Sequence, residues 1–423
     1  MFKKLLKLLS NDLVKVFSYT SISTLIKIIS SYVAVKVVAS IIGPAGVALV
    51  GQLQNFTTIF TTIGAGGINN GVVKYVSEHK ENKSELQKYL SNGFKITTFF
   101  SVISGLISII FCKYLSKWIL FEDRYYYLFV FFGISLILSS LNNFFLSILN
   151  GFKEFKIFVI ISIITNIVSL LFTILLVSIY HLDGALIAVV TSQGFILFIT
   201  LFFLIRKEWF SKKLIAPLDK QIVKKFFSYT LMAFVSAMTV PIAQLLIRGY
   251  IIQNYSIKDA GFWEGINKIS AMYLMFVTTS FSVYYLPRLS EINNNSLLRK
   301  EIFKTYKVMA PLVFITLLTI YFLKDFVINI LFTKEFYPMK DLFKWQLLGD
   351  FFKILSWLLA FIMVAKSMTK LFIFTEIFFS GLLILLSYYF INRDGMIGAT
   401  ESYCITYFVY FVLMILIFRK KLF

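Results

Sequence analysis

The sequence predicts an all-α polytopic membrane protein, with 12 transmembrane helices in two parallel-repeat six-helix lobes around a central cavity. The first observation is composition: of 423 residues, 58% are hydrophobic and only 15% are charged, with a mean hydropathy of +0.81. Soluble domains are about 25% charged, so a soluble enzyme and a soluble nucleic-acid binder are both excluded. The second observation is a series of long apolar runs. The third is an internal repeat.

The apolar runs have the length of membrane-spanning helices, which need roughly 20 apolar residues each. Breaks at charged residues or at Gly and Pro separate twelve runs, joined by short segments. Both chain ends must then lie on one side of the membrane. The predicted spans are 14–42, 46–76, 89–112, 126–150, 155–180, 184–205, 226–253, 260–287, 303–323, 341–365, 371–391 and 396–418.

The net charge of +21, from 42 Lys and Arg against 21 Asp and Glu, is mostly a topology signal. With the N-terminus in the cytoplasm, 26 of the cations lie in cytoplasmic segments, nine on the opposite side and seven within spans. Lys and Arg concentrate in cytoplasmic loops. Both termini are therefore predicted to be cytoplasmic.

The two halves of the chain echo each other at an offset of 210 to 215 residues. The segment KVFSYT at 15–20 returns as KFFSYT at 225–230. Shorter echoes are Ala45-Gly46 with Ala260-Gly261, Ser77-Glu78 with Ser290-Glu291, 119–121 with 330–332, and Asp183-Gly184 with Asp394-Gly395. Because six is an even number, both copies of a six-span repeat enter the membrane from the same side. In such a parallel repeat the substrate path lies between the two halves. We expect an N-lobe at 1–206, a cytoplasmic linker at 207–221 and a C-lobe at 222–423.

Charged residues within the spans are the candidates for a transport site, because each costs at least about 2.5–3.5 kcal/mol if it faces lipid. Lys27 lies near mid-membrane and is expected to line the cavity, whereas Lys36 lies near a span end and can snorkel. Lys74 and Lys95 lie near cytoplasmic ends, where snorkelling and substrate capture explain them equally well. The seven cations are Lys27, Lys36, Lys74, Lys95, Arg248, Lys268 and Lys353, and the four acids are Glu264, Asp350, Glu376 and Glu401.

Helical spacing pairs some of these charges. Glu264 with Lys268 (i, i+4) and Asp350 with Lys353 (i, i+3) can meet on one helix face. In each pair the two charges either simply neutralise each other, or a substrate anion or proton competes for the pairing and switches it between two states. Arg248 has no acid nearby on its own span and is expected to bind phosphate, since a guanidinium can bind it in bidentate fashion.

The sequence also bears on movement and cofactors. Pro241 is expected to kink its span and act as a hinge. The two histidines, His79 and His181, lie in loops and form no metal-ligand cluster, so no metal is expected. No P-loop, Ser/His/Asp set or HExxH motif occurs, so neither a cofactor nor catalysis is expected. Within the spans cations outnumber acids, which favours an anionic cargo.

Several motifs resemble one family of transporters. They are GPAG at 43–46, NGVVKYV at 70–76, FSYTLMA at 227–233, SFSVY at 280–284 with Leu286-Pro287 and Leu289-Ser290, and a block comprising DLF at 341–343, WQL at 345–347, Gly349-Asp350 and Lys353. The chain resembles the Wzx-type flippases of lipid-linked oligosaccharides, in the polysaccharide-transport branch of the MOP superfamily. It looks closest to the O-antigen and enterobacterial common antigen (lipid III) translocases, over essentially its whole length.

The resemblance implies translocation of undecaprenyl-pyrophosphate-linked glycan from the cytoplasmic to the periplasmic leaflet of the bacterial inner membrane, by alternating access and in lipopolysaccharide or related polysaccharide biosynthesis. It implies a cationic central cavity that receives the pyrophosphate, and Lys27, Lys74, Arg248, Asp350 and Lys353 match the residue types of the family motifs. Lys268 is expected to line the same cavity because it lies within a span. Glu264 and Asp350 are candidates for coupling to H⁺ or Na⁺. Glu264, Lys268 and Glu401 depart from the family pattern and are either adaptations to one glycan or idiosyncratic. Expected partners are the lipid-linked glycan, membrane lipids and the glycan polymerase machinery, but not nucleic acid.

Three alternative functions share some of these features. A multidrug exporter of the same superfamily would favour a more acidic cavity. A glycan polymerase or ligase needs a sizeable outer loop, and no outer segment is long enough. A major-facilitator carrier shares twelve spans, but its expected loop motif between spans two and three is absent from EHKENK at 78–83.

Overall fold

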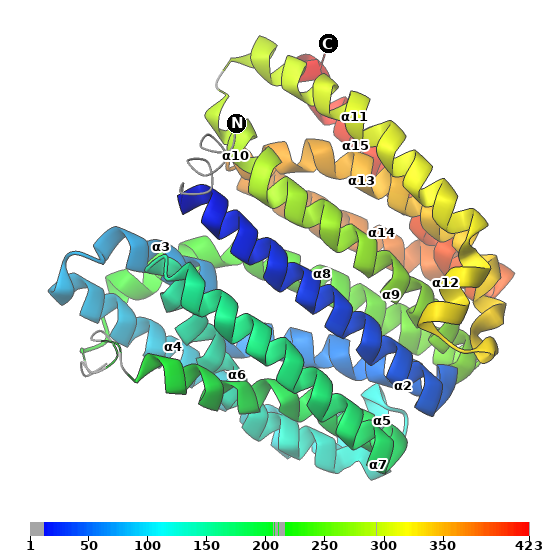
Figure 1. The fold of residues 1–423 in the computed structure, drawn as a ribbon, viewed down its shortest axis with the longest axis horizontal. Helices are drawn as coiled ribbons and strands as arrows, with labels where there is room; N and C mark the ends of the chain where they lie inside the picture. The colour runs from blue at the N-terminus through cyan, green and yellow to red at the C-terminus, as the bar shows by residue number, and fades with distance from the viewer. Residues whose placement is uncertain (1–11, 206, 208–209, 211–215, 293, 423) are drawn as a thin grey trace, which may run out of the picture. The chain divides into compact units, whose positions relative to one another are not determined.

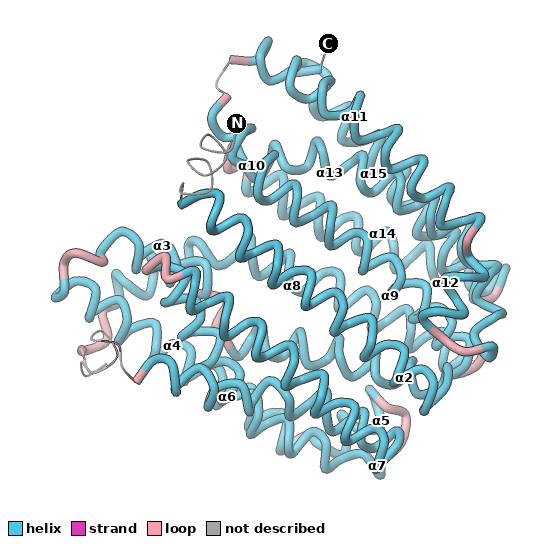
Figure 2. Tube along the Cα trace, viewed as in Figure 1, coloured by secondary structure: helices cyan, strands magenta, loops and turns pink. Residues whose placement is uncertain are grey.

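The computed structural model describes residues 12–205, 207, 210, 216–292 and 294–422, and the regular elements of this part of the chain are all helical (Figures 1 and 2). The predicted all-α class is thus confirmed. The elements are α2 (Asp12–Gly64), α3 (Asn69–His79), α4 (Lys83–Ile110), α5 (Cys112–Ile119), η1 (Asp123–Tyr125), α6 (Tyr126–Gly151), α7 (Phe155–Leu204), α8 (Lys220–Asn254), α9 (Ile257–Ser280), η2 (Phe281–Tyr285), α10 (Leu286–Glu291), α11 (Asn295–Phe322), α12 (Lys324–Leu331), η3 (Lys334–Leu342), α13 (Phe343–Ala365), α14 (Thr369–Asp394) and α15 (Met396–Leu422).

Contacts divide the described residues into two compact units. Unit 1 takes those within Met1–Ile41 and Leu53–Met238, and unit 2 those within Ile42–Gln52 and Thr239–Phe423. In unit 1, α6 packs against α3, α4 and α7; in unit 2, α13 packs against α9, α11 and α15. The division falls within α2 and within α8, so segment 42–52 of α2 belongs to unit 2.

Two of the longest helices bend sharply. In α2 the bend is at Gly43, which has φ of 63° and precedes Pro44, as the predicted break between the first two spans requires. In α7 it is at His181, with φ of 49° and ψ of −120°. A Cβ on Gly184 would lie 1.9 Å from the carbonyl oxygen of Leu176, so the chain doubles back here and only glycine allows this approach.

The predicted span at 46–76 is wrong as a single helix. It consists of the second arm of α2, a turn at 65–68 and the short helix α3. Gly66 and Gly67 have φ of 63° and 62°, a region that glycine adopts without the steric cost of a side chain. The glycines therefore end α2 and separate it from α3.

The internal repeat is visible in the helix boundaries. α4 and α11 each have 28 residues and begin 212 residues apart, after Asn82 and Asn294, whose side chains both accept a first-turn backbone N–H. Each is followed by a helix of 8 residues, α5 or α12. The first arm of α7, at 155–180, matches α14 at 369–394 in length. The predicted duplication is thus present in the structure.

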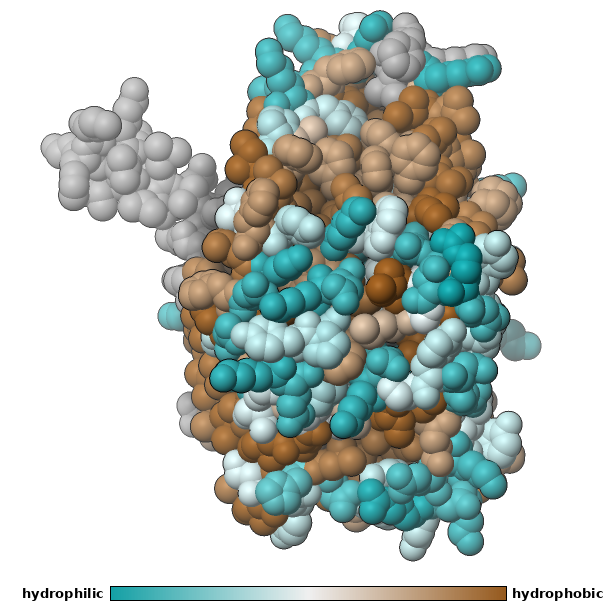
Figure 3. Space-filling model, turned by 90° about the vertical axis from the view of Figure 1, so that its right-hand side faces the viewer, coloured by the Kyte–Doolittle hydropathy of each residue, from teal (hydrophilic) through white to brown (hydrophobic). Residues whose placement is uncertain are grey.

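Apolar side chains cover much of the outer surface. Ile110, Phe202, Phe322 and Leu385 are each at least 68% exposed, and the face in Figure 3 carries broad apolar areas beside clusters of hydrophilic side chains. Within the described residues, nine helical segments are long and apolar enough to cross a membrane. Two of them, Ser23–Gly64 and Phe155–Leu204, have 42 and 50 residues and are bent in the middle, so each has the length for two crossings. The chain is a multi-pass membrane protein, and the count of twelve spans stays a prediction.

Candidate functional site

A buried ion pair joins two helices of unit 2. The guanidinium of Arg248, on α8, pairs with the carboxylate of Glu264, on α9, and the two side chains are 1% and 6% exposed. Arg248 Nη1 also donates to Gln52 Oε1 at 3.2 Å, and Gln52 Nε2 donates to the carbonyl of Leu245 at 3.2 Å. Gln52 belongs to segment 42–52 of α2, so the cluster joins that segment to α8 and α9.

Two glycines allow this close packing. A Cβ on Gly51 would lie 2.6 Å from Cδ of Glu264, and a Cβ on Gly261 would lie 2.0 Å from the carbonyl oxygen of Pro44. Neither distance is possible for a real side chain. These positions therefore let α9 and segment 42–52 approach closely enough to bury Glu264.

The buried acid is shared by two cations. Lys268 Nζ lies 3.3 Å from Glu264 Oε1, as the i, i+4 spacing predicts, and the lysine side chain is 27% exposed. The Arg248 guanidinium also lies 5.4 Å from the ring centre of Trp263, a favourable distance for a cation–π contact. Two cations and one carboxylate leave the cluster with a formal charge of +1.

A second buried cluster surrounds Asp350 on α13, which has no exposed surface. Three hydroxyls donate to its carboxyl group: Ser270 Oγ at 2.7 Å and Tyr273 Oη, both from α9, and Tyr403 Oη at 2.7 Å from α15. A buried carboxyl needs such donors because water is excluded. In the first repeat, at an offset of 214 residues, the matching position is Leu136, so this cluster is a feature of the second half of the chain.

Lys353 adjoins this cluster through a tyrosine. Its Nζ donates to Tyr403 Oη at 3.0 Å, and the ammonium lies 5.3, 5.2 and 4.7 Å from the ring centres of Trp357, Tyr403 and Tyr407. Aromatic rings on several sides stabilise a cation in place of water. The same unit holds Glu376, whose Oε2 accepts from Thr239 Oγ1 at 3.4 Å.

Three of the span lysines in unit 1, Lys27, Lys74 and Lys95, differ in their surroundings. Lys27 is exposed on α2. Lys74 on α3 is one-third exposed, with Nζ 3.6 Å from Glu78 Oε1. Lys95 on α4 donates to the carbonyl of Ala216 at 2.7 Å and so anchors the end of the connection into α8.

The structure corrects two sequence-based expectations. Arg248 has no acid on its own span but meets Glu264 of α9, so the expected Glu264–Lys268 pair is incomplete, because Arg248 shares the same carboxylate. Asp350 and Lys353 do not pair directly; the hydroxyl of Tyr403 lies between them. Sequence reasoning missed Gln52, Tyr273 and Tyr403, since contacts between helices leave no spacing signal in the sequence.

Pro241, the expected hinge, lies inside α8. α8 continues through Pro241 without interruption, and the division between the units falls at 238/239, close to this proline. Within the described part of the chain, no three His, Cys, Asp or Glu side chains come together to hold a metal ion. Linker residues 208–209 and 211–215 lie outside the described residues.

Solved structures with the same fold are transporters. An inward-facing multidrug resistance MATE family transporter of the MOP superfamily matches with a TM-score of 0.81, at 13% identity, over 93% of this chain and 94% of that one. The lipid II flippase MurJ in an inward closed conformation matches with a TM-score of 0.74, at 14% identity, over 97% and 89%. The chain therefore has the fold of MOP superfamily transporters.

Sequence comparison defines the family. The chain is 28% identical over 414 residues to the lipid III flippase of Escherichia coli (strain K12), which covers 97% of this chain and all of the relative. It is equally similar to the lipid III flippase of Shigella flexneri. The family model described as polysaccharide biosynthesis protein matches residues 13–293. The chain belongs to the polysaccharide biosynthesis protein family.

Proposed function

We propose that this protein is a flippase that translocates undecaprenyl-pyrophosphate-linked oligosaccharide, an O-antigen or enterobacterial common antigen unit, from the cytoplasmic to the periplasmic leaflet. The observation that carries this is the similarity to two lipid III flippases along almost the entire chain. The transporter fold and the apolar, multi-pass surface support it. The bacterial inner membrane, with both termini cytoplasmic, is the corresponding location.

The excess of cations over acids within the predicted spans supports an anionic headgroup as the part of the cargo that the protein binds. Of the cations expected to line the cavity, Lys27 is exposed and Lys74 is one-third exposed, so these two make first contact with the diphosphate. Lys353 offers an ammonium surrounded by aromatic rings, a setting in which a phosphate can replace the tyrosine hydroxyl as partner.

Arg248 plays a different part in this scheme. Because Glu264 neutralises it in a dry environment, it contacts phosphate only after this ion pair separates. A substrate anion or a proton on Glu264 would favour that separation, which couples cargo binding to a change of state, as alternating access requires. Coupling to H⁺ or Na⁺ through Glu264 or Asp350, lobes at 1–206 and 222–423 with the linker 207–221, and a hinge at Pro241 complete the proposal.

Complementation tests the proposed cargo. The gene is expressed in a set of bacterial strains, each lacking one defined glycan flippase, and surface glycan is measured. We expect restoration in a strain that lacks an O-antigen or lipid III flippase. Restoration in none, together with raised drug resistance in a susceptible host, would instead favour a multidrug exporter of the same fold.

A further inference from the structure

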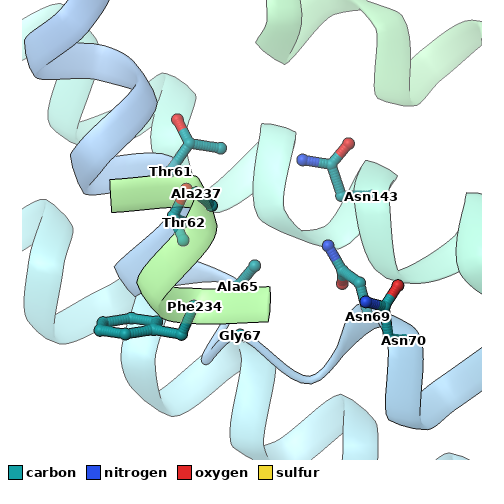
Figure 4. Close-up of a pocket in the computed structure, with 9 residues that line it drawn as sticks. All are labelled: Thr61, Thr62, Ala65, Gly67, Asn69, Asn70, Asn143, Phe234 and Ala237. Atoms are coloured by element: carbon teal, nitrogen blue, oxygen red, sulfur yellow. The ribbon is translucent and has the colours of Figure 1, made fainter. Parts of the chain in front are cut away.

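Unit 1 contains a pocket that is separate from the charged residues described above. Its volume is about 300 Å³, within the range of known ligand pockets, which begins at about 300 Å³. Figure 4 shows the lining: two threonines with Phe234 and Ala237 on one side, and three asparagines on the other. None of the nine lining residues is charged; they are Thr61, Thr62, Ala65, Gly67, Asn69, Asn70, Asn143, Phe234 and Ala237.

The local fold explains how this lining is assembled. The turn at Gly66 and Gly67 breaks the helix between α2 and α3, and Asn69 and Asn70 in the first turn of α3 line the pocket together with Thr61 and Thr62 at the end of α2. Asn143 comes from α6, and Phe234 and Ala237 come from α8. Asn70 is exposed, so the pocket is open to ligand at that end.

Several polar atoms of the lining remain available to a ligand. The hydroxyls of Thr61 and Thr62 donate to the carbonyls of Thr57 and Thr58 at 2.6 and 2.8 Å, which leaves their oxygens able to accept. Asn69 Oδ1 is buried and has no hydrogen-bond partner among the described residues. An unsatisfied buried acceptor costs about 1–3 kcal/mol, so a ligand that donates to it is favoured.

These groups define the chemistry of the occupant. Asparagine amides and hydroxyl oxygens both donate and accept, which suits a ligand rich in hydroxyl or acetamido groups. Ala65 and Ala237 add apolar methyl groups that can contact a C–H face. A diphosphate would require cations and an organic cation would require acids, and the lining offers neither. A neutral sugar ring fits the chemistry and the volume.

We infer that this pocket binds the sugar attached directly to the diphosphate of the lipid-linked cargo, an inference that rests on the proposed function. Asn70 and Lys74 are four residues apart on the same side of α3, about 6 Å along its axis. A diphosphate held at Lys74 thus places its first sugar at the asparagines. The pocket selects for a glycosylated carrier over a bare one.

The test compares two purified lipids, undecaprenyl diphosphate and undecaprenyl diphosphate bearing one N-acetylglucosamine. Their dissociation constants from the purified protein are measured in detergent by native mass spectrometry. The wild-type protein is expected to prefer the glycosylated lipid. Asn69→Leu and Asn143→Leu, which keep side-chain size, are each expected to reduce that preference about tenfold, the equivalent of about one hydrogen bond to a buried polar group.

Asn166→Leu is the matched control. This α7 amide donates to the carbonyl of Ser162 in its own helix at 2.8 Å, so its loss leaves the preference unchanged. Retained binding of undecaprenyl diphosphate by the pocket variants shows that they are folded. Equal wild-type affinity for both lipids, or a preference that survives both pocket substitutions, would overturn the pocket assignment alone. Binding of neither lipid by the wild type would overturn the proposed function and this inference together.

Discussion

Arg248 of α8 and Glu264 of α9 form an ion pair almost without solvent exposure, 16 residues apart in the sequence. The pair is held by Gln52 from segment 42–52 of α2 and shares its carboxylate with Lys268. A charge in such a place is stable only while its partner is present. The pair therefore contributes to folding. It also means that Arg248 can stay charged and buried only while Glu264 is paired with it.

Glu264→Gln should destabilise the protein strongly, because it leaves Arg248 buried without a counter-charge. The expected loss is about 3–5 kcal/mol in the free energy of unfolding, measured by denaturant titration in micelles. Glu291→Gln is the control: its partner Arg288 lies 3.6 Å away and both side chains are exposed, so the loss should be at most about 1 kcal/mol. Equal losses in the two variants would contradict the buried pair.

Gly51→Ala should disrupt the same cluster without changing any charge. The added methyl would lie 2.6 Å from Glu264 Cδ, and the overpacking should cost about 1–3 kcal/mol of unfolding free energy. Gly381→Ala on α14 is the control, because no atom of the described residues comes within 4 Å of its Cβ position. That variant should be neutral or more stable by up to about 1 kcal/mol. The reverse order of stabilities would refute the close approach of α9 to Gly51.

Tyr403→Phe should weaken the Asp350 cluster, since it removes the hydroxyl that lies between Lys353 and Asp350. We expect a loss of about 1–3 kcal/mol in unfolding free energy and reduced glycan export. Tyr407→Phe keeps the ring 4.7 Å from Lys353 Nζ and should change stability by no more than about 0.5 kcal/mol. If both variants behave alike, the hydroxyl has no special role.

Lys74→Ala should lower glycan export about tenfold with little effect on stability, because a charge-assisted contact to phosphate is lost from a partly exposed site. Glu78→Gln removes the same ion pair but keeps the lysine, so export should be retained. Export is measured as surface glycan per unit of protein in the membrane. Loss of export in both variants would show that the ion pair, and not the cation, matters.

Pro241→Ala should make α8 stiffer, because proline provides no N–H for the carbonyl of Ala237. Thermal unfolding should shift upward while the rate of flipping falls, as expected for a hinge. Pro311→Ala in α11, a proline away from the division between units, should leave the flipping rate unchanged. A faster or unchanged rate in Pro241→Ala would rule out the hinge.

Sequence patterns predict the structural features that depend on residues close together in the chain. The helical class, the break at Gly43-Pro44 and the Glu264–Lys268 pair all follow from spacing within one helix or from local backbone limits. The register of the repeat is harder to predict. The echo of Asp183-Gly184 in Asp394-Gly395 suggests an offset of 211, whereas the structure matches Gly184 with Gly398.

The glycine comparison shows why this register differs. A Cβ on Gly184 would meet the carbonyl oxygen of Leu176, and one on Gly398 that of Phe390, so both glycines occupy the same place in a reversal. The preceding bends are at His181 and Gly395, both with positive φ. Equivalent positions in the two repeats share a backbone conformation and need not share a residue type. A histidine in one half can therefore take the place of a glycine in the other.

The polar clusters were predictable only in part, for a different reason. Arg248 and Glu264 meet because two helices pack, and the sequence encodes that packing through small residues that have many other uses. The asparagine pocket carries no charge, so a search for buried charges does not find it. Tertiary contacts between neutral or distant residues require the structure.

The central claim is tested most directly by transfer of a fluorescent undecaprenyl-diphosphate-linked glycan between the leaflets of vesicles that contain only this protein. Leaflet position is measured by the access of a membrane-impermeant quencher. We expect transfer well above that in protein-free vesicles, reduced about tenfold by Lys74→Ala and retained in Glu78→Gln. Transfer no faster than in protein-free vesicles, with folded protein present, would contradict the account.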